Sequence, residues 1–281
     1  MNTIKLNNNV EMPILGFGVY RVEDYEECKK ACIYAIEAGY RHIDTASIYL
    51  NEKAVGDAIK ESGINRKEMF ITTKLWIQDA DYDKAKKAFQ ISMEKLGLDY
   101  LDLYLLHMPF GNYYAAWKAM EELYESGYIR AIGCCNLYKD RLIDFAAHSK
   151  IMPAINQIET HPFFQRWEDQ DLMKEYNITL ESWGPLAEGK NNIFNNEILK
   201  SIGKKYNKTV AQVILRWLTQ RNIPIIPKSI HKERIIENSK IFDFTLDDND
   251  MNLIKTLDNN KNIIFLNDDA DFIKQLLKLK Y

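Results

Sequence analysis

Three side chains in the first third of the chain have the types needed to pass a proton to an oxygen atom. Asp44 and Tyr49 lie in the segment GYRHIDTASIY, and Lys74 lies in FITTKLW. A phenol is a weak acid, and a lysine ammonium within hydrogen-bond reach lowers its pKa. A carboxylate on the far side of the lysine keeps it charged and oriented. We therefore expect Asp44, Tyr49 and Lys74 to form a proton-donating unit.

His107, in YLDLYLLHMP, adds a group that can contact the substrate oxygen itself. A neutral imidazole donates a hydrogen bond to a carbonyl oxygen, which polarises the carbonyl and fixes its angle. The apolar run before His107 favours the neutral form. Each of these residues alone is more often a packed or ion-paired side chain. Together they suit the reduction of a carbonyl by hydride, because the oxygen gains a proton as charge builds on it.

The elements that must position these residues follow a regular alternation of short apolar runs with longer amphipathic stretches. The runs predict strands at residues 14–17, 42–43, 69–73, 101–106, 129–134, 154–158, 178–182 and 224–227. The stretches predict helices at residues 24–38, 52–61, 82–96, 113–125, 139–147, 167–176, 210–219 and 232–238.

Eight such units without a Pro/Gly/Ser-rich linker predict an α/β fold, a closed (β/α)8 TIM barrel that forms a single domain over residues 1–281. Outside the repeat we expect an N-terminal β-hairpin at 4–12, an extra helix at 193–206, and a tail from Thr245 over the active-site mouth. Because parallel strands end at one mouth, Asp44, Lys74 and His107 should converge there.

Composition and charge limit the class of protein further. The 281 residues are 46% hydrophobic and carry a net charge of −3, which does not favour nucleic-acid binding. The start of the chain lacks the layout of a secretory signal, and no apolar stretch reaches bilayer length. The cysteines, Cys28, Cys32, Cys134 and Cys135, have no metal-ligand spacing. We expect a cytoplasmic monomer without a metal, with reduced thiols and a small molecule as its partner.

A second cluster of interest follows the last predicted strand, in the segment IIPKSIHKER. Lys228, Ser229 and Arg234 lie at the start of a predicted helix, where backbone amides favour an anion. Cations at that end oppose the helix dipole and so need a compensating negative charge. TIM barrels commonly bind phosphate in the region after strands seven and eight. We therefore expect a phosphorylated cofactor at this position.

Taken together, the segments MPILGFG, NQIETHP and IPKS followed by RIIEN resemble the aldo-keto reductase family over nearly the whole chain. Trp183 followed by Gly-Pro-Leu is similar to the bacterial branch that contains diketogluconate and glyoxal reductases. The resemblance implies a (β/α)8 barrel that binds NADPH and reduces aldehydes and ketones. It implies Tyr49 as general acid, Lys74 and Asp44 as the groups that tune it, and His107 as the group that orients the carbonyl.

The resemblance also implies which residues contact the cofactor and the substrate. The cofactor residues would be Gly18, Val19, Tyr20, Asp44, Cys135, Asn136, Gln157, Trp183, Gly184, Pro185, Leu186, Lys228, Ser229, Ile230, His231, Arg234, Glu237 and Asn238. Trp183 would stack on the nicotinamide, Asn136 and Gln157 would hold its carboxamide, and Glu237 would approach the adenine. The substrate pocket would be bounded by Tyr20, Ile48, Tyr49, Trp76, His107 and Met108. This lining fits small aldehydes and ketones and selects none of them.

Departures from the family pattern concern Cys135, which stands in place of a serine, and His231, which stands in place of a threonine. The role of Cys135 is open because a thiol is the weaker hydrogen-bond group. His231 can add a pH-dependent contact to the phosphate.

Three other functions are compatible with parts of the sequence. Tyr25 and Lys29 fit the YxxxK pattern of short-chain dehydrogenases, but they come before any complete glycine-rich turn. A barrel that binds NADPH without turnover would act as a sensor or a structural protein. A Schiff-base isomerase or aldolase would use Lys74 as its nucleophile, which Asp44 and Tyr49 oppose by keeping that lysine protonated.

Overall fold

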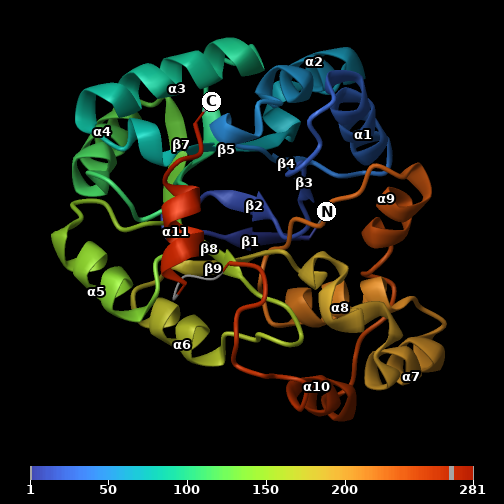
Figure 1. Ribbon diagram of the computed structural model, residues 1–281. Helices are drawn as coiled ribbons and strands as arrows, with labels where there is room; N and C mark the ends of the chain where they lie inside the picture. The colour runs from blue at the N-terminus through green and yellow to red at the C-terminus, as the bar shows by residue number, and fades with distance from the viewer. Residues whose placement is uncertain (1, 266–268, 281) are drawn as a thin grey trace.

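The computed structural model describes residues 2–265 and 269–280, and its centre is a curled parallel sheet (Figure 1). Seven strands lie side by side in the order in which they occur in the chain. They are β3 (Phe17–Gly18), β4 (His42–Asp44), β5 (Phe70–Leu75), β6 (Leu101–Leu106), β7 (Ile129–Cys135), β8 (Ile155–Glu159) and β9 (Thr179–Trp183).

The sheet closes through the segment expected as the eighth strand, which forms single bridges instead of a regular strand. Ile225 bridges in parallel to Leu15 on one side and to Ser182 on the other. Prolines at positions 224 and 227 have no N–H to donate, which interrupts a regular ladder. The approach is close, since a Cβ on Gly18 would lie 2.8 Å from the carbonyl oxygen of Ile226. The predicted barrel is therefore confirmed, with a shorter final strand.

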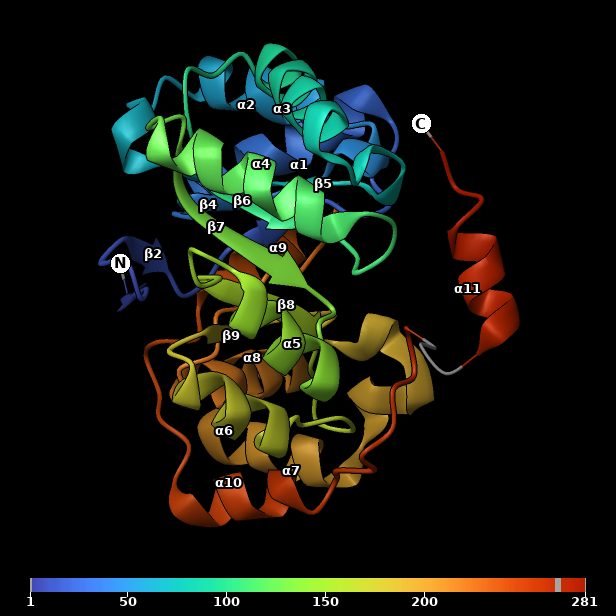
Figure 2. The same ribbon diagram turned by 90° about the vertical axis from the view of Figure 1, so that its left-hand side faces the viewer.

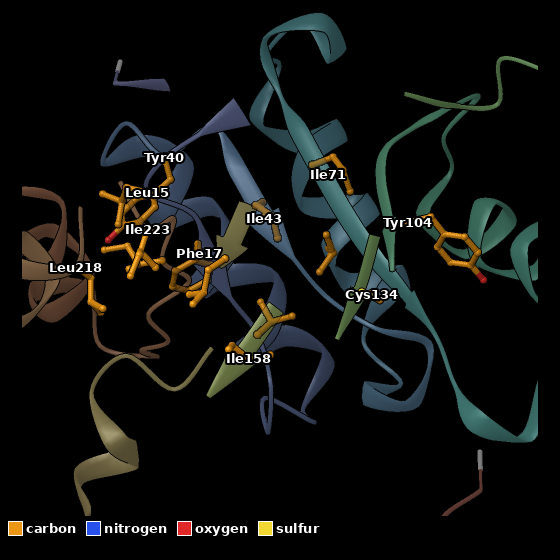
Figure 3. Close-up of a cluster of buried hydrophobic side chains, with 14 of the residues drawn as sticks. Leu15, Phe17, Tyr40, Ile43, Ile71, Tyr104, Cys134, Ile158, Leu218 and Ile223 are labelled. Carbon is orange, nitrogen blue, oxygen red and sulfur yellow. The ribbon is translucent and has the colours of Figure 1, made fainter. Parts of the chain in front are cut away.

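Helices surround the sheet at the positions that the hydrophobic periodicity predicts. They are α1 (Tyr25–Glu37), α2 (Glu52–Ser62), α3 (Tyr82–Leu96), α4 (Tyr113–Glu125), α5 (Lys139–His148), α6 (Trp167–Glu175), α8 (Val210–Gln220) and α9 (Lys232–Ser239). Buried apolar side chains from the strands and from helices such as α8 fill the space between the two layers (Figure 3).

The extra helix expected at 193–206 begins later than predicted, as α7 (Glu197–Tyr206). Residues 187–195 form 3-10 turns that are interrupted by Glu188, Asn191 and Asn192 at positive φ, which an α-helix does not tolerate. Asn196 then caps α7, since its side chain accepts hydrogen bonds from the amides of residues 198 and 199.

The hairpin and the tail lie at opposite ends of the barrel (Figure 2). The hairpin strands β1 (Thr3–Lys5) and β2 (Glu11–Pro13) pack beneath the barrel, where Leu6 and Met12 contact inward-facing side chains. The tail contains α10 (Asp248–Lys255) and α11 (Ala270–Leu276), and its apolar residues pack at the other end, as predicted. Among the described residues, no helix is long and apolar enough to cross a bilayer.

Candidate active site

Lys74 lies near the carboxyl end of β5 and is fully buried. Its ammonium forms an ion pair with Asp44, the last residue of the neighbouring β4, and donates to the carbonyl oxygen of Thr45 at 2.9 Å. The Lys74 nitrogen also lies 5.2 Å from the centre of the Tyr49 ring. The three residues that we expected to form a proton-donating unit are therefore brought together.

Tyr49 is presented by the short 3-10 turn η1 (Ser47–Tyr49), and hydrogen bonds on both sides fix that turn. The Ser47 hydroxyl donates to the carbonyl oxygen of Lys74 at 3.0 Å. After the turn, the Asn51 amide donates to the carbonyl oxygen of Val19 at 2.9 Å. These contacts tie the turn to β5 and to the loop after β3, so the phenol is held at the mouth of the barrel.

His107 follows β6 and faces Tyr49 across the mouth. The distance between its Nε2 and the Tyr49 hydroxyl is 3.5 Å, and the Trp76 ring packs edge-on at 5.0 Å. Burial and the nearby Lys74 charge hold the pKa of His107 well below its usual range. The imidazole is therefore neutral, as the apolar run before it indicates, and one of its nitrogens carries a hydrogen that it can donate.

Burial and charge act in opposite directions on the other two titrating groups. Burial lowers the pKa of Lys74, but the Asp44 carboxylate more than offsets this, so that the pKa lies above its ordinary value. For Tyr49, burial raises the pKa while Lys74 lowers it, and the net direction is upward. Lys74 thus lowers the pKa of Tyr49 as expected, but in the free protein desolvation of the phenolate is the larger effect. The phenol stays protonated and available as a donor.

A second carboxyl group, which the sequence analysis did not single out, lies behind this unit. Gln157 donates through Nε2 to Asp44 Oδ2 and to Glu181 Oε2, both at 2.9 Å. Glu181 is fully buried on β9, and its Oε1 has no partner among the described residues. Burial first, and then repulsion from Asp44, raise the pKa of Glu181 to about 8. A charged residue inside a run predicted as a buried strand was the pattern that could have revealed it.

We predict that Glu181 makes the stability of this protein depend on pH. The unfolded carboxyl has a pKa of about 4.3, so between that value and about 8 only the native state holds the proton. Stability contributed by the neutral carboxyl is complete below the lower value and is lost as the pH rises through this window. Glu181→Gln keeps the acceptor and cannot ionise. The free energy of unfolding, measured with urea, should fall between about pH 5 and about pH 9 in the wild-type protein. In the variant this fall should be about 2 to 5 kcal/mol smaller. Equal falls in both proteins would contradict this assignment.

The residues expected around the nicotinamide carboxamide lie together next to this network. Asn136 donates to the carbonyl oxygen of His107 at 3.3 Å and accepts from the Trp183 indole at 3.0 Å. The Cys135 thiol lies 4.0 Å from Gln157 Oε1, at the limit of a weak hydrogen bond. The Gln157 amide therefore presents its oxygen toward Cys135 and its nitrogen toward the carboxyl groups.

The residues expected to hold the phosphate lie in the segment just before α9 and on α9 itself. The Ser229 hydroxyl accepts from the amide of His231 at 3.1 Å, and Asn238 is buried on the same helix. Lys228 and Arg234 are both exposed, and within residues 2–265 and 269–280 neither forms an ion pair. Two unpaired cations, a hydroxyl and helix amides fit a phosphate group. Glu237, expected near the adenine, accepts a hydrogen bond from the Thr209 hydroxyl at 2.8 Å.

The expected substrate side of the mouth is apolar and is completed by the tail. Trp76 and Met108 form a cluster with Phe265 and Leu276, and Ile48 packs against it. The Trp76 indole donates to the carbonyl oxygen of Leu279 at 3.0 Å. Tyr20, with its ring 5.0 Å from that of Tyr49, is half exposed at the edge. Trp76 thus takes part in packing as well as in lining the mouth.

Comparison with known proteins identifies the class to which this barrel and site belong. The model of the aldo/keto reductase family matches residues 15–259. The chain belongs to the aldo-keto reductase family, and it is an NADPH-dependent oxidoreductase that reduces aldehydes and ketones.

Particular relatives are similar over almost their whole length. Glyoxal reductase of Bacillus subtilis (strain 168) is 47% identical over 263 residues, covering 93% of this chain and 95% of the relative. Methylglyoxal reductase DkgA of Escherichia coli (strain K12) is 42% identical over 266 residues, covering 92% and 94%. The crystal structure of a Bombyx mori aldo-keto reductase in complex with NADP has a TM-score of 0.90 at 33% identity, covering 95% of this chain and 96% of that one.

Proposed function

We propose that this protein reduces small 2-oxoaldehydes such as glyoxal and methylglyoxal, with Tyr49 as the general acid. The observation that carries the roles of the residues is the 3.5 Å distance between the Tyr49 hydroxyl and His107 Nε2, with the Lys74–Asp44 ion pair behind the phenol. Two hydrogen-bond donors that converge at one point suit a single carbonyl oxygen. The names of the two relatives above support the substrate class.

In the reaction, the residues of the chain hold the carbonyl and supply its proton. NADPH, when bound, supplies the hydride to the carbonyl carbon. His107 donates a hydrogen bond to the carbonyl oxygen and fixes its direction, while Tyr49 donates its own hydrogen bond to the same atom. As negative charge grows on that oxygen, the phenol proton passes to it and the product is an alcohol. The Lys74 ammonium stabilises the phenolate left behind, and Asp44 keeps that ammonium charged.

The proposed fit of the chain to NADPH rests on two groups of residues. At one end Gln157, Asn136 and Cys135 would hold the carboxamide, beside Trp183. At the other end Lys228, just before α9, and Arg234, on α9, would hold the 2′-phosphate, together with the buried Asn238 of the same helix. The other cofactor residues that the resemblance implies are Gly18, Val19, Tyr20, Gly184, Pro185 and Leu186, together with Ser229, Ile230, His231 and Glu237 in and next to α9.

The substrate proposal is tested by following the loss of NADPH absorbance with glyoxal, methylglyoxal and simple aliphatic aldehydes of matched size. A higher kcat/KM for the 2-oxoaldehydes is expected, and a preference for the simple aldehydes would refute the substrate class. NADPH binding without oxidation by any aldehyde would support the sensor alternative. Borohydride treatment in the presence of substrate should leave Lys74 unmodified, because a charged amine is not a nucleophile.

The preference for NADPH gives a separate prediction. Lys228→Ala or Arg234→Ala should weaken NADPH binding about tenfold to a hundredfold, because each removes a charged partner of the phosphate. NADH binding, which involves no 2′-phosphate, should change little. Lys232→Ala is the matched control, since Lys232 lies on the same helix but pairs with Glu37 at 3.0 Å. Fluorescence titration of both nucleotides measures the effect, and equal weakening of both would contradict the phosphate assignment.

We also propose that residues 1–281 act as a single-domain monomer in the cytoplasm. All the expected site residues come from one chain, and the tail of the same chain completes the mouth. The four cysteines are free and buried, which suits a reducing compartment.

A further inference from the structure

Another buried carboxylate, besides those of Asp44 and Glu181, lies at the mouth, and it has no part in the roles described above. It belongs to β8, on the far side of the barrel from the Asp44 strand β4. Glu159 is the last residue of β8 and is fully buried. Its Oε1 accepts from the amides of Ile263 at 2.8 Å and Ile264 at 3.1 Å. Its Oε2 accepts from the amide of Phe265 at 2.8 Å. One carboxylate thus binds three successive amides of the tail.

His161 supports this contact from the barrel side. Its Nε2 lies 3.1 Å from Glu159 Oε1, and its ring is fully buried. Burial raises the pKa of Glu159, but His161 and the tail amides lower it by more, so the net direction is downward. Glu159 is therefore a charged acceptor. Hydrogen bonds to a charged acceptor are about twice as strong as neutral ones.

The segment held by Glu159 contacts both sides of the expected site. Phe265 packs with Trp76 and Met108 on the substrate side. On the cofactor side, Ile264 packs closely against Gly184. A Cβ added to Gly184 would lie only 2.9 Å from the Ile264 Cδ1 atom. In Figure 2 the tail passes from α10 along the barrel to α11 at its end. The position of the three amides therefore determines where the apolar residues of the tail lie over the mouth.

We propose that Glu159, held by His161, is a positioning residue that anchors the start of the tail and thereby sets substrate selectivity. The anchor itself is independent of the reaction, whereas its effect on selectivity rests on the proposed function. With the anchor in place, Phe265 narrows the mouth and gives a small substrate an apolar wall. Without it, a small substrate loses that wall, and a bulky one gains room.

The test is Glu159→Gln, which keeps the shape but turns one acceptor oxygen into an NH2 group that faces amide donors. We expect trypsin cleavage after Lys274, on α11, to be about tenfold faster, as the loss of a charged hydrogen bond implies. KM for methylglyoxal should rise about tenfold with kcat nearly unchanged, while KM for a bulky aromatic aldehyde should rise less. Intact-mass analysis and steady-state kinetics measure these effects.

Lys190→Gln is the matched control, because Lys190 donates to the carbonyl oxygen of Ile263 at 3.0 Å from an exposed position. Its loss should change cleavage and KM by no more than about twofold. A folded Glu159→Gln protein with wild-type cleavage and wild-type KM would overturn the proposal. So would a parallel fall in kcat for every substrate with no change in KM, because that pattern indicates a role in the chemistry.

Phe265→Ala provides a second test of the proposal if Glu159→Gln does not fold. It leaves the carboxylate and its three amide contacts in place, so cleavage should stay near the wild-type rate while KM for methylglyoxal rises. An unchanged KM would overturn the link to selectivity. Failure of the proposed function is distinguishable, since the wild-type protein would then prefer simple aldehydes to methylglyoxal or oxidise no NADPH at all, while the cleavage assay would still report on the anchor.

Discussion

Replacing Tyr49 with phenylalanine is expected to lower kcat by about 10² to 10⁴-fold, the usual cost of losing a general acid. The ring keeps its packing against Tyr20 and His107, so only the hydroxyl is lost. NADPH affinity should stay near the wild-type value because the hydroxyl pairs with His107, which is not among the residues expected to hold the cofactor. Steady-state kinetics with methylglyoxal, together with a titration of NADPH, measures both quantities.

Tyr25→Phe is the control for this prediction and also tests the short-chain dehydrogenase alternative. Tyr25 lies on α1 at the surface, where its hydroxyl donates to Asp57 at 2.5 Å. We expect its loss to leave turnover unchanged. Retained activity in Tyr49→Phe would mean that another group donates the proton, and a large loss in Tyr25→Phe would favour the YxxxK pair.

Hydrophobic periodicity predicted most of the fold because burial in a barrel is regular. The helices at 82–96 and 113–125 have the predicted bounds, since each has a continuous apolar face between clear end points. The eighth strand was less predictable. Its two isoleucines indicate burial, but pairing depends on partners at Leu15 and Ser182, far away in the sequence.

Some residues of the candidate site could be predicted from local sequence pattern, whereas the roles of others depend on tertiary packing. Asp44, Lys74 and His107 were predictable because each directly follows a run predicted as an apolar strand. Glu181 lies inside a strand and Glu159 at the end of one. Their roles depend on Gln157 and on the amides of residues 263–265, which no spacing indicates. The net pKa of Tyr49 was not predictable either, because the sequence gives the neighbouring charge but not the depth of burial.

Lys74→Met is expected to have the other large effect, on stability and on turnover together. The Asp44 carboxylate would remain fully buried without its cation, which typically costs about 3 to 5 kcal/mol. Among the described groups that act on Tyr49, Lys74 is the one that lowers its pKa, so the phenolate would lose that stabilisation. Turnover should therefore fall by roughly the same 10² to 10⁴-fold as in Tyr49→Phe. Urea unfolding and steady-state kinetics measure the two losses.

The double variant Asp44→Asn, Lys74→Met separates the two effects. Asparagine is neutral and can still accept the hydrogen bond from Gln157, so the uncompensated charge disappears and most of the lost stability should return. Turnover should stay low, because no ammonium remains to stabilise the phenolate. Recovery of turnover along with stability would show that Lys74 supports the fold alone, and the proton donor would then have to work without it.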